Sequence, residues 1–131
     1  MRYTKHKSEE SLEDYLETIL FLHKKTNNVR SIDIATNMGF TKPSVSVAMK
    51  HLRELGYITM ASNGHITLTE TGMQRAEDVL ERHTLLTNWL ISIGVKEEIA
   101  REDACRMEHD ISVETFAAIK SYINKQSDYD K

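Results

Sequence analysis

The chain has 131 residues, of which 40% are hydrophobic and 28% charged, and its formal net charge is −3. This length suits one compact unit or two small subdomains, and no apolar run approaches the roughly 18 residues that span a bilayer. A single cysteine excludes an internal disulfide framework, and one proline with five glycines is too few for an all-β chain. With a polar N-terminus that lacks a signal-peptide core, we expect a cytoplasmic protein without membrane association.

Charge is distributed unevenly along the chain. Residues 1–60 contain nine Lys/Arg against seven Asp/Glu, whereas residues 61–131 contain eight against thirteen. A mildly basic first half and an acidic second half suit a nucleic-acid-binding face joined to a cation-binding body.

The first predicted helix covers residues 8–25. Its apolar residues recur at helical spacing and predict a buried face, formed by Leu12, Tyr15, Leu16, Ile19, Leu20 and Leu22. Asp14 and Glu17 lie three residues apart on a neighbouring face. Such a pair is either two solvated acids or two oxygen ligands presented from one turn.

A short helix is predicted at residues 31–38, with Ser31 as its cap, and Gly39-Phe40 forms a turn. Thr41 is a natural N-cap for the next helix, and Pro43 falls in its first turn, where a missing N–H costs nothing. This second helix should end near Leu55, before Gly56. A short helix, a tight turn and a longer helix make a helix-turn-helix.

The second of these helices has the residue types of a DNA-reading element. An apolar stripe should hold it on the domain through Val45, Ala48, Met49, Leu52 and Leu55. Small hydroxyl side chains on the other side approach phosphates and base edges closely, and lysines neutralise phosphate charge. We therefore expect contacts to double-stranded DNA from Ser31, Thr41, Lys42, Pro43, Ser44, Ser46 and Lys50.

The remaining elements complete a mainly α fold. Two β-prone runs flank Asn63-Gly64 in residues 57–69, which predicts a hairpin, and a hairpin after a recognition helix is a wing. Helices are then expected from Thr69 to Ile93, from 96 to 110 and, capped by Ser112, from 113 to 124. We expect a winged helix-turn-helix domain at residues 1–71 and an all-helical metal-binding and dimerisation domain at 72–131.

The segment E-D-A-C-R-M-E-H-D-I-S, residues 102–112, begins in the helix expected at 96–110. In a helix, Cys105, Glu108 and His109 fall at i, i+3 and i+4, which places three metal-ligating side chains of mixed softness on one face. The alternative is a solvated helix face. His83 by itself reads as a packing or surface residue. Apolar side chains in excess of what so small a subdomain can bury predict a homodimer, with candidate contacts from Trp89, Leu90, Phe116 and Tyr122.

Four sequence blocks resemble the DtxR/MntR family of metal-dependent transcriptional repressors: S-L-E-D-Y-L-E-T-I, S-V-S-V-A-M-K-H-L-R-E-L-G-Y-I, E-R-H-T-L-L and D-A-C-R-M-E-H-D-I-S. The resemblance is to the manganese-type two-domain branch. It implies a metal cluster between the two domains, with ligands Asp14, Glu17, His83, Cys105, Glu108 and His109.

Cys105 departs from the manganese branch, which usually has a glutamate at this position. The iron branch has a cysteine there, but it has methionine where this chain has Asp14. The resemblance therefore implies Mn(II) or Fe(II) as the sensed ion, with Co(II), Zn(II) or other divalent metals binding in vitro. A thiolate shifts preference away from manganese.

The function implied is a repressor of metal-uptake genes in which metal fixes the geometry of a dimer on a palindromic operator. A winged-helix regulator that senses oxidants through Cys105 is an alternative. A small metalloenzyme is a weaker one, because the sequence has no glycine-rich phosphate loop, no H-E-x-x-H and no nucleophile–base pair. We expect no catalytic residues.

Overall fold

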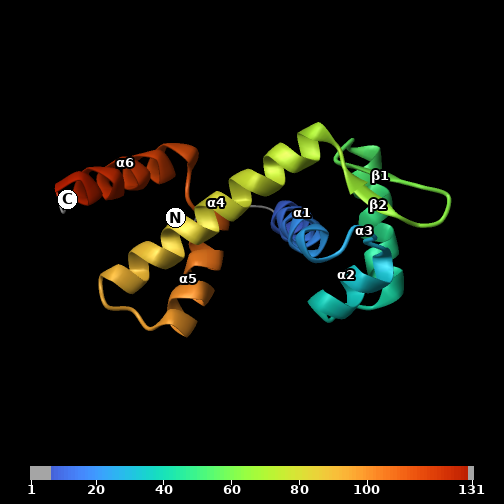
Figure 1. The fold of residues 1–131 in the computed structure, drawn as a ribbon, viewed down its shortest axis with the longest axis horizontal. Helices are drawn as coiled ribbons and strands as arrows, with labels where there is room; N and C mark the ends of the chain where they lie inside the picture. Colours follow the sequence, from blue (N-terminus) through green and yellow to red (C-terminus); the bar gives the residue numbers. More distant parts are fainter. Residues whose placement is uncertain (1–6, 130–131) are drawn as a thin grey trace. The chain divides into compact units, whose positions relative to one another are not determined.

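In the computed structural model, the backbone of residues 7–129 and the side chains of residues 12–126 are described. This part of the chain forms six helices and one hairpin (Figure 1). The elements are α1 (Lys7–Lys25), α2 (Ser31–Met38), α3 (Lys42–Glu54), β1 (Ile58–Met60), β2 (Ile66–Leu68), α4 (Glu70–Ser92), α5 (Glu97–Asp110) and α6 (Val113–Tyr129). The mainly helical fold with a small antiparallel wing is confirmed. No described helix is both long and apolar enough to cross a membrane.

The chain divides into two compact units, an N-terminal unit of residues 6–78 and a C-terminal unit of residues 79–131. The division falls inside α4. We had expected the boundary at residue 71, between the wing and this helix, and that domain boundary stays a prediction.

The core of the N-terminal unit is formed by the predicted apolar faces of α1 and α3 together with α2. Its fully buried side chains include Leu16, Ile19, Ile34, Val45 and Met49. Leu55 was expected to join the stripe of α3, but 48% of its side chain is exposed. It follows the last helical residue, Glu54, at the position where the chain leaves the helix.

The helix-turn-helix is built as expected except at its first cap. Arg30, not Ser31, holds the N-cap position of α2, and its backbone N–H donates to Asp33 Oδ2 at 2.9 Å. The prediction for Ser31 was wrong because the carboxylate three residues into the helix satisfies the cap instead. Gly39 closes α2 with φ 73°, a left-handed conformation that only glycine adopts without strain.

The wing is a two-stranded antiparallel hairpin with the register Ile58↔Leu68 and Met60↔Ile66. Two hydrogen bonds of Ile66 attach β2 to the rest of the unit. Its N–H donates to Val29 O at 2.8 Å, and its carbonyl oxygen accepts from His23 Nε2 at 2.9 Å. The predicted hairpin is confirmed, and β2 is held directly against the end of α1.

The base of the wing meets the start of α4 at Gly72. The Thr69 hydroxyl donates to Gly56 O at 2.7 Å and accepts from the Gly72 N–H at 3.1 Å, which draws the helix onto the chain that precedes β1. Gly72 is buried, and a Cβ at this position would overlap the backbone carbonyl of Tyr57. Only glycine permits this approach without displacing the backbone.

Gly72→Ala should therefore lower the free energy of unfolding by about 2 kcal/mol, within the range measured for overpacking of tight contacts. The added methyl group meets backbone and not the flexible end of a side chain. Chemical denaturation of the full chain measures the effect. Thr71→Ala, at the exposed neighbouring position, is the control and should leave stability unchanged. Equal stability of Gly72→Ala and wild type would contradict the close approach.

In the C-terminal unit, the second half of α4 packs with α5 and α6 around Leu86, Ala104 and Phe116. Phe116 is 9% exposed, so its assignment to a dimer surface is wrong; it is a core residue. Partly buried side chains surround this cluster, among them Trp89 and Leu90, whereas Tyr122 is 56% exposed. The Ser112 cap is confirmed by a 3.1 Å hydrogen bond from the Thr115 N–H. The predicted end of α6 at 124 is wrong, because the helix continues to Tyr129 through residues that include no proline or glycine.

Candidate metal centre and DNA-binding face

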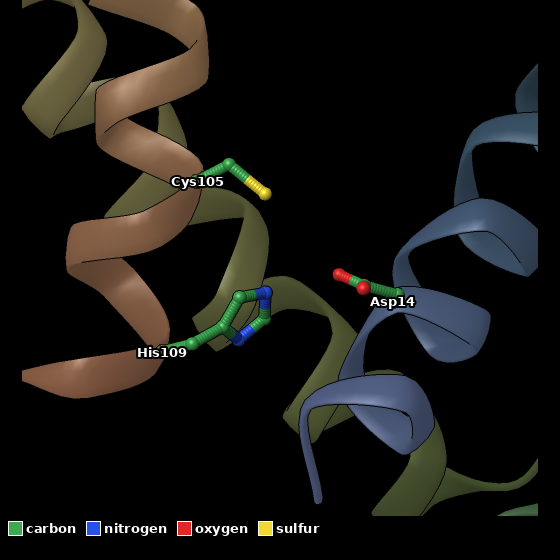
Figure 2. A group of neighbouring side chains, drawn as sticks. All are labelled: Asp14, Cys105 and His109. Atoms are coloured by element: carbon green, nitrogen blue, oxygen red, sulfur yellow. The ribbon is translucent and has the colours of Figure 1, made fainter. Parts of the chain in front are cut away.

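Helix α5 presents the Cys105, Glu108 and His109 side chains from one face. Figure 2 shows Cys105 and His109 projecting from the same side of this helix, one turn apart. Glu108 is 0% and His109 5% exposed, and Cys105 is partly buried. The alternative of a solvated helix face is therefore wrong for Glu108 and His109.

Helix α4 brings His83 to the same carboxylate. His83 Nδ1 lies 3.2 Å from Glu108 Oε2, and His109 Nε2 lies 3.5 Å from Glu108 Oε1. The neighbouring Arg82 Nη1 donates to the backbone oxygen of Glu108 at 3.2 Å, which ties α4 to this turn of α5. Within the C-terminal unit the fold thus brings two of the predicted ligands, His83 and His109, to Glu108, with Cys105 one turn earlier.

The Glu108 carboxylate is unusual for a buried acid. Both of its oxygens are inaccessible, and neither accepts a hydrogen bond from any described residue. A buried carboxylate without hydrogen bonds is strongly destabilising unless a cation compensates it. Two ligands bonded to one ion at about 2.1 Å, with an angle between 90° and 109°, lie roughly 3.0–3.4 Å apart. The 3.2 Å separation of His83 Nδ1 and Glu108 Oε2 fits this arrangement.

Asp14 and Glu17, the two remaining predicted ligands, lie on α1 in the N-terminal unit, three residues apart and half-buried. Figure 2 also shows the Asp14 carboxylate as it projects from α1. Their neighbour Glu13 was not among the residues predicted to be buried, yet it is 3% exposed, and its Oε2 lies 3.7 Å from Arg75 Nη2 of α4. Its spacing from Leu16 and Leu20 is that of the apolar stripe, and this signal would have identified it as a buried residue.

The predicted DNA-binding residues of α3 lie on the side of the helix away from the core. Thr41, Lys42, Pro43, Ser44, Ser46 and Lys50 are all exposed, whereas Ser31 on α2 is half-buried. Thr41 is also the confirmed N-cap: its hydroxyl accepts from the Ser44 N–H at 3.3 Å and donates to Ser44 Oγ at 2.8 Å. Val47 and His51, which were not among the predicted residues, are exposed on the same side. Counting 100° per residue from the buried positions would have found them.

Two family models match almost the whole chain. Residues 8–66 match the N-terminal DNA-binding domain of the iron-dependent repressors, and residues 69–128 match their metal-binding and dimerisation domain. The chain belongs to the DtxR/MntR family of metal-dependent transcriptional repressors.

Other members of the DtxR/MntR family show the extent of the similarity. The transcriptional regulator MntR of Escherichia coli O6:H1 is 36% identical over 116 residues, which are 88% of this chain and 75% of the relative. A helix-turn-helix transcriptional regulator of Methanocaldococcus jannaschii is 32% identical over 91% of this chain and 97% of its own length. A solved manganese-dependent transcriptional repressor in complex with manganese is 25% identical, with a TM-score of 0.78, and covers 86% of this chain. This chain spans 52% of that longer repressor.

Proposed function

We propose that this protein is an Mn(II)- or Fe(II)-responsive repressor of metal-uptake genes that acts in the cytoplasm on a palindromic operator. The observation that carries the proposal is the fully buried Glu108 carboxylate, which contacts two histidines and accepts no hydrogen bond from the described residues. The membership of the chain in a repressor family with a DNA-binding and a metal-binding domain supports the same function.

Six residues would hold the metal: Asp14, Glu17, His83, Cys105, Glu108 and His109. We assign the two acids of α1 to the same centre as the four donors of α4 and α5, because all six together give the mixed oxygen, nitrogen and sulfur set of a first-row divalent ion. When bound, such an ion supplies positive charge that compensates three carboxylates and a thiolate. Without that charge the carboxylates repel one another, and the two domains sample other separations.

The donor types bear on the identity of the metal. Five oxygen or nitrogen donors suit Mn(II) and Fe(II), whereas the Cys105 thiolate is softer and favours iron, cobalt or zinc. Relatives support a divalent ion without selecting one, since solved repressors of this fold are described with manganese and with Zn²⁺ and Cd²⁺. We therefore propose Mn(II) or Fe(II) in the cell, with Co(II) and Zn(II) as ligands in vitro.

DNA binding follows from a two-fold homodimer that presents two copies of α3. Helices of this kind read half-sites that lie one helical turn of DNA apart, about 34 Å, so the separation of the two α3 helices decides affinity. The Lys42 and Lys50 side chains would neutralise phosphates, and the Ser44 and Ser46 hydroxyls would approach the DNA closely. Metal binding selects the dimer with the correct separation.

Family membership favours this function over the two alternatives. A redox regulator would respond to oxidants through Cys105 and would not require Asp14, and a small metalloenzyme would turn over a substrate. Neither alternative accounts for the match of the chain to both domains of a repressor family.

Anaerobic DNA binding tests the proposal. The probe is a duplex enriched from a random-sequence pool by the purified protein in the presence of metal, and Mn(II), Fe(II), Co(II) and Zn(II) are titrated separately. We expect at least one metal to strengthen binding, and His109→Ala to weaken that metal response by more than the roughly 10- to 100-fold cost of losing an outer-shell partner. Asp110→Ala, at the exposed next position of α5, should respond as wild type does.

Two outcomes would contradict the proposal. Equal binding with and without every metal would leave a winged-helix DNA-binding protein without a sensor. A full metal response in His109→Ala would show that the assigned centre is wrong.

A further inference from the structure

Helix α3 has one side chain whose position is not explained by folding. The buried positions Val45, Met49 and Leu52 define the face that packs on the core. At 100° per residue, Val47 is rotated about 200° from Val45, so it lies at the centre of the opposite face. Its side chain is 70% exposed.

A valine at this position does not stabilise the helix. A β-branched side chain lowers helix propensity relative to alanine, and an exposed one buries little apolar surface to offset that cost. One turn before and one turn after Val47, its neighbours on this face are Pro43, Ser44, Lys50 and His51, all of which are exposed. Val47 is therefore an exposed branched apolar group on a face of α3 that also carries hydroxyl and basic side chains.

Beside Val47 the surface is hollowed and apolar. A hollow of about 230 Å³ lies between α1 and α3 in the N-terminal unit, lined by Leu12, Tyr15, Ser44, Val47, Ala48, His51 and Leu52. An apolar group that approaches α3 along this side would meet hydrocarbon and would not strip water from a charged side chain. The surrounding lysines favour phosphates, whereas the centre of the face favours a methyl-sized apolar group.

We propose that Val47 is a specificity-determining residue, which packs against the C5-methyl group of a thymine in the major groove of each operator half-site. Thymine is the only base that presents a methyl group there, and apolar side chains recognise it by contact. The inference rests on the proposed function, in which α3 is the recognition helix. Lys42 and Lys50 contact the phosphate backbone of the DNA, which carries no sequence information, and Val47 adds the sequence preference.

Uracil substitution tests this contact, because uracil differs from thymine only by the missing methyl group. The duplex enriched by the metal-loaded protein is resynthesised with uracil in place of each thymine in turn, and dissociation constants are measured at saturating metal and one fixed salt concentration. At one thymine per half-site, we expect wild type to lose affinity about fourfold, the effect of one buried methyl group. Val47→Ala should bind the unmodified duplex with an affinity lower by a similar factor. Uracil at that thymine should not lower the affinity of this variant further.

Two controls separate this role from a structural one. Val47→Ala should have a thermal midpoint equal to or higher than that of wild type, because alanine is the better helix former. Val113→Ala changes another exposed valine, at the start of α6 and 76% exposed, and should keep the full uracil effect.

The outcomes distinguish the inference from the function on which it rests. A uracil effect that persists unchanged in Val47→Ala, or no uracil effect in wild type, overturns the role of Val47 and leaves the repressor intact. Failure of wild type to enrich any duplex in the presence of metal overturns the proposed function and this inference with it.

Discussion

Glu108→Gln should abolish the metal response while the apo-protein remains at least as stable as wild type. The amide keeps the shape of the side chain but removes the charged oxygen ligand that faces His83 and His109. In the apo state the substitution also removes a buried charge whose oxygens accept no hydrogen bond from the described residues. We expect the free energy of unfolding of the apo-protein to stay equal or to rise by up to about 2 kcal/mol.

Two measurements are needed for this variant: metal affinity by anaerobic competition with a chelator, and denaturation of metal-free protein. Metal affinity should fall by more than about 100-fold, beyond the cost of losing an outer-shell partner. Asp103→Asn is the matched control on α5, since the Asp103 carboxylate pairs with Arg106 at 3.3 Å on the exposed side of the helix. If Glu108→Gln bound metal as wild type does, the buried carboxylate would not be a ligand.

Cys105→Glu should change which metal the protein prefers. The substitution replaces a soft thiolate with a hard carboxylate and gives the position the residue type of the manganese branch that the chain resembles. We expect the ratio of Mn(II) to Co(II) affinity to rise at least tenfold, about 1.4 kcal/mol. Separate anaerobic titrations of the variant and wild type measure this ratio.

Absorption spectroscopy supplies an independent readout for Cys105. Co(II)-loaded wild type should show a sulfur-to-cobalt charge-transfer band in the near ultraviolet, and both Cys105→Glu and Cys105→Ser should lose it. The absence of this band from Co(II)-loaded wild type would mean that the thiolate is not a ligand. An unchanged metal ratio in Cys105→Glu would mean that this position does not govern selectivity.

Local signals predicted most of the fold. The Thr41 and Ser112 caps, the turn at Gly39 and the Asn63-Gly64 hairpin each depend on residues within three or four positions of one another. Such features are determined by backbone chemistry that a short segment carries with it. The order and approximate bounds of the helices followed from them.

The errors arose where a more distant residue, or a competing local one, decided the outcome. Arg30 replaced Ser31 as N-cap because Asp33 reaches back to its N–H. Phe116 was assigned to the surface, but the packing of α4, α5 and α6 buries it. Glu13 looked like an acid near the start of a helix, yet it lies in the buried stripe beside Arg75. The outcomes for Arg30 and Phe116 cannot be read from periodicity alone, whereas the spacing of Glu13 from Leu16 and Leu20 does place it in the buried stripe.

The candidate site was predictable in part. The spacing of Cys105, Glu108 and His109 identified a donor face in α5 from sequence. The position of His83 in the sequence did not predict that it lies with these donors, because its approach to Glu108 depends on how α4 packs on α5. Only the resemblance to the family suggested it. Whether the Glu108 carboxylate accepts hydrogen bonds could not be predicted from sequence, because the answer depends on the positions of all the donors around it.

The attachment of the wing through Ile66 distinguishes the base of the hairpin from its tip. Ile66 of β2 makes two hydrogen bonds to the rest of the unit, whereas Ala61, Ser62 and Asn63 at the tip are exposed. Exposed loop tips of this kind accept insertions and substitutions without loss of the fold. The wing tip can therefore take changes of length and charge while the helices keep their packing.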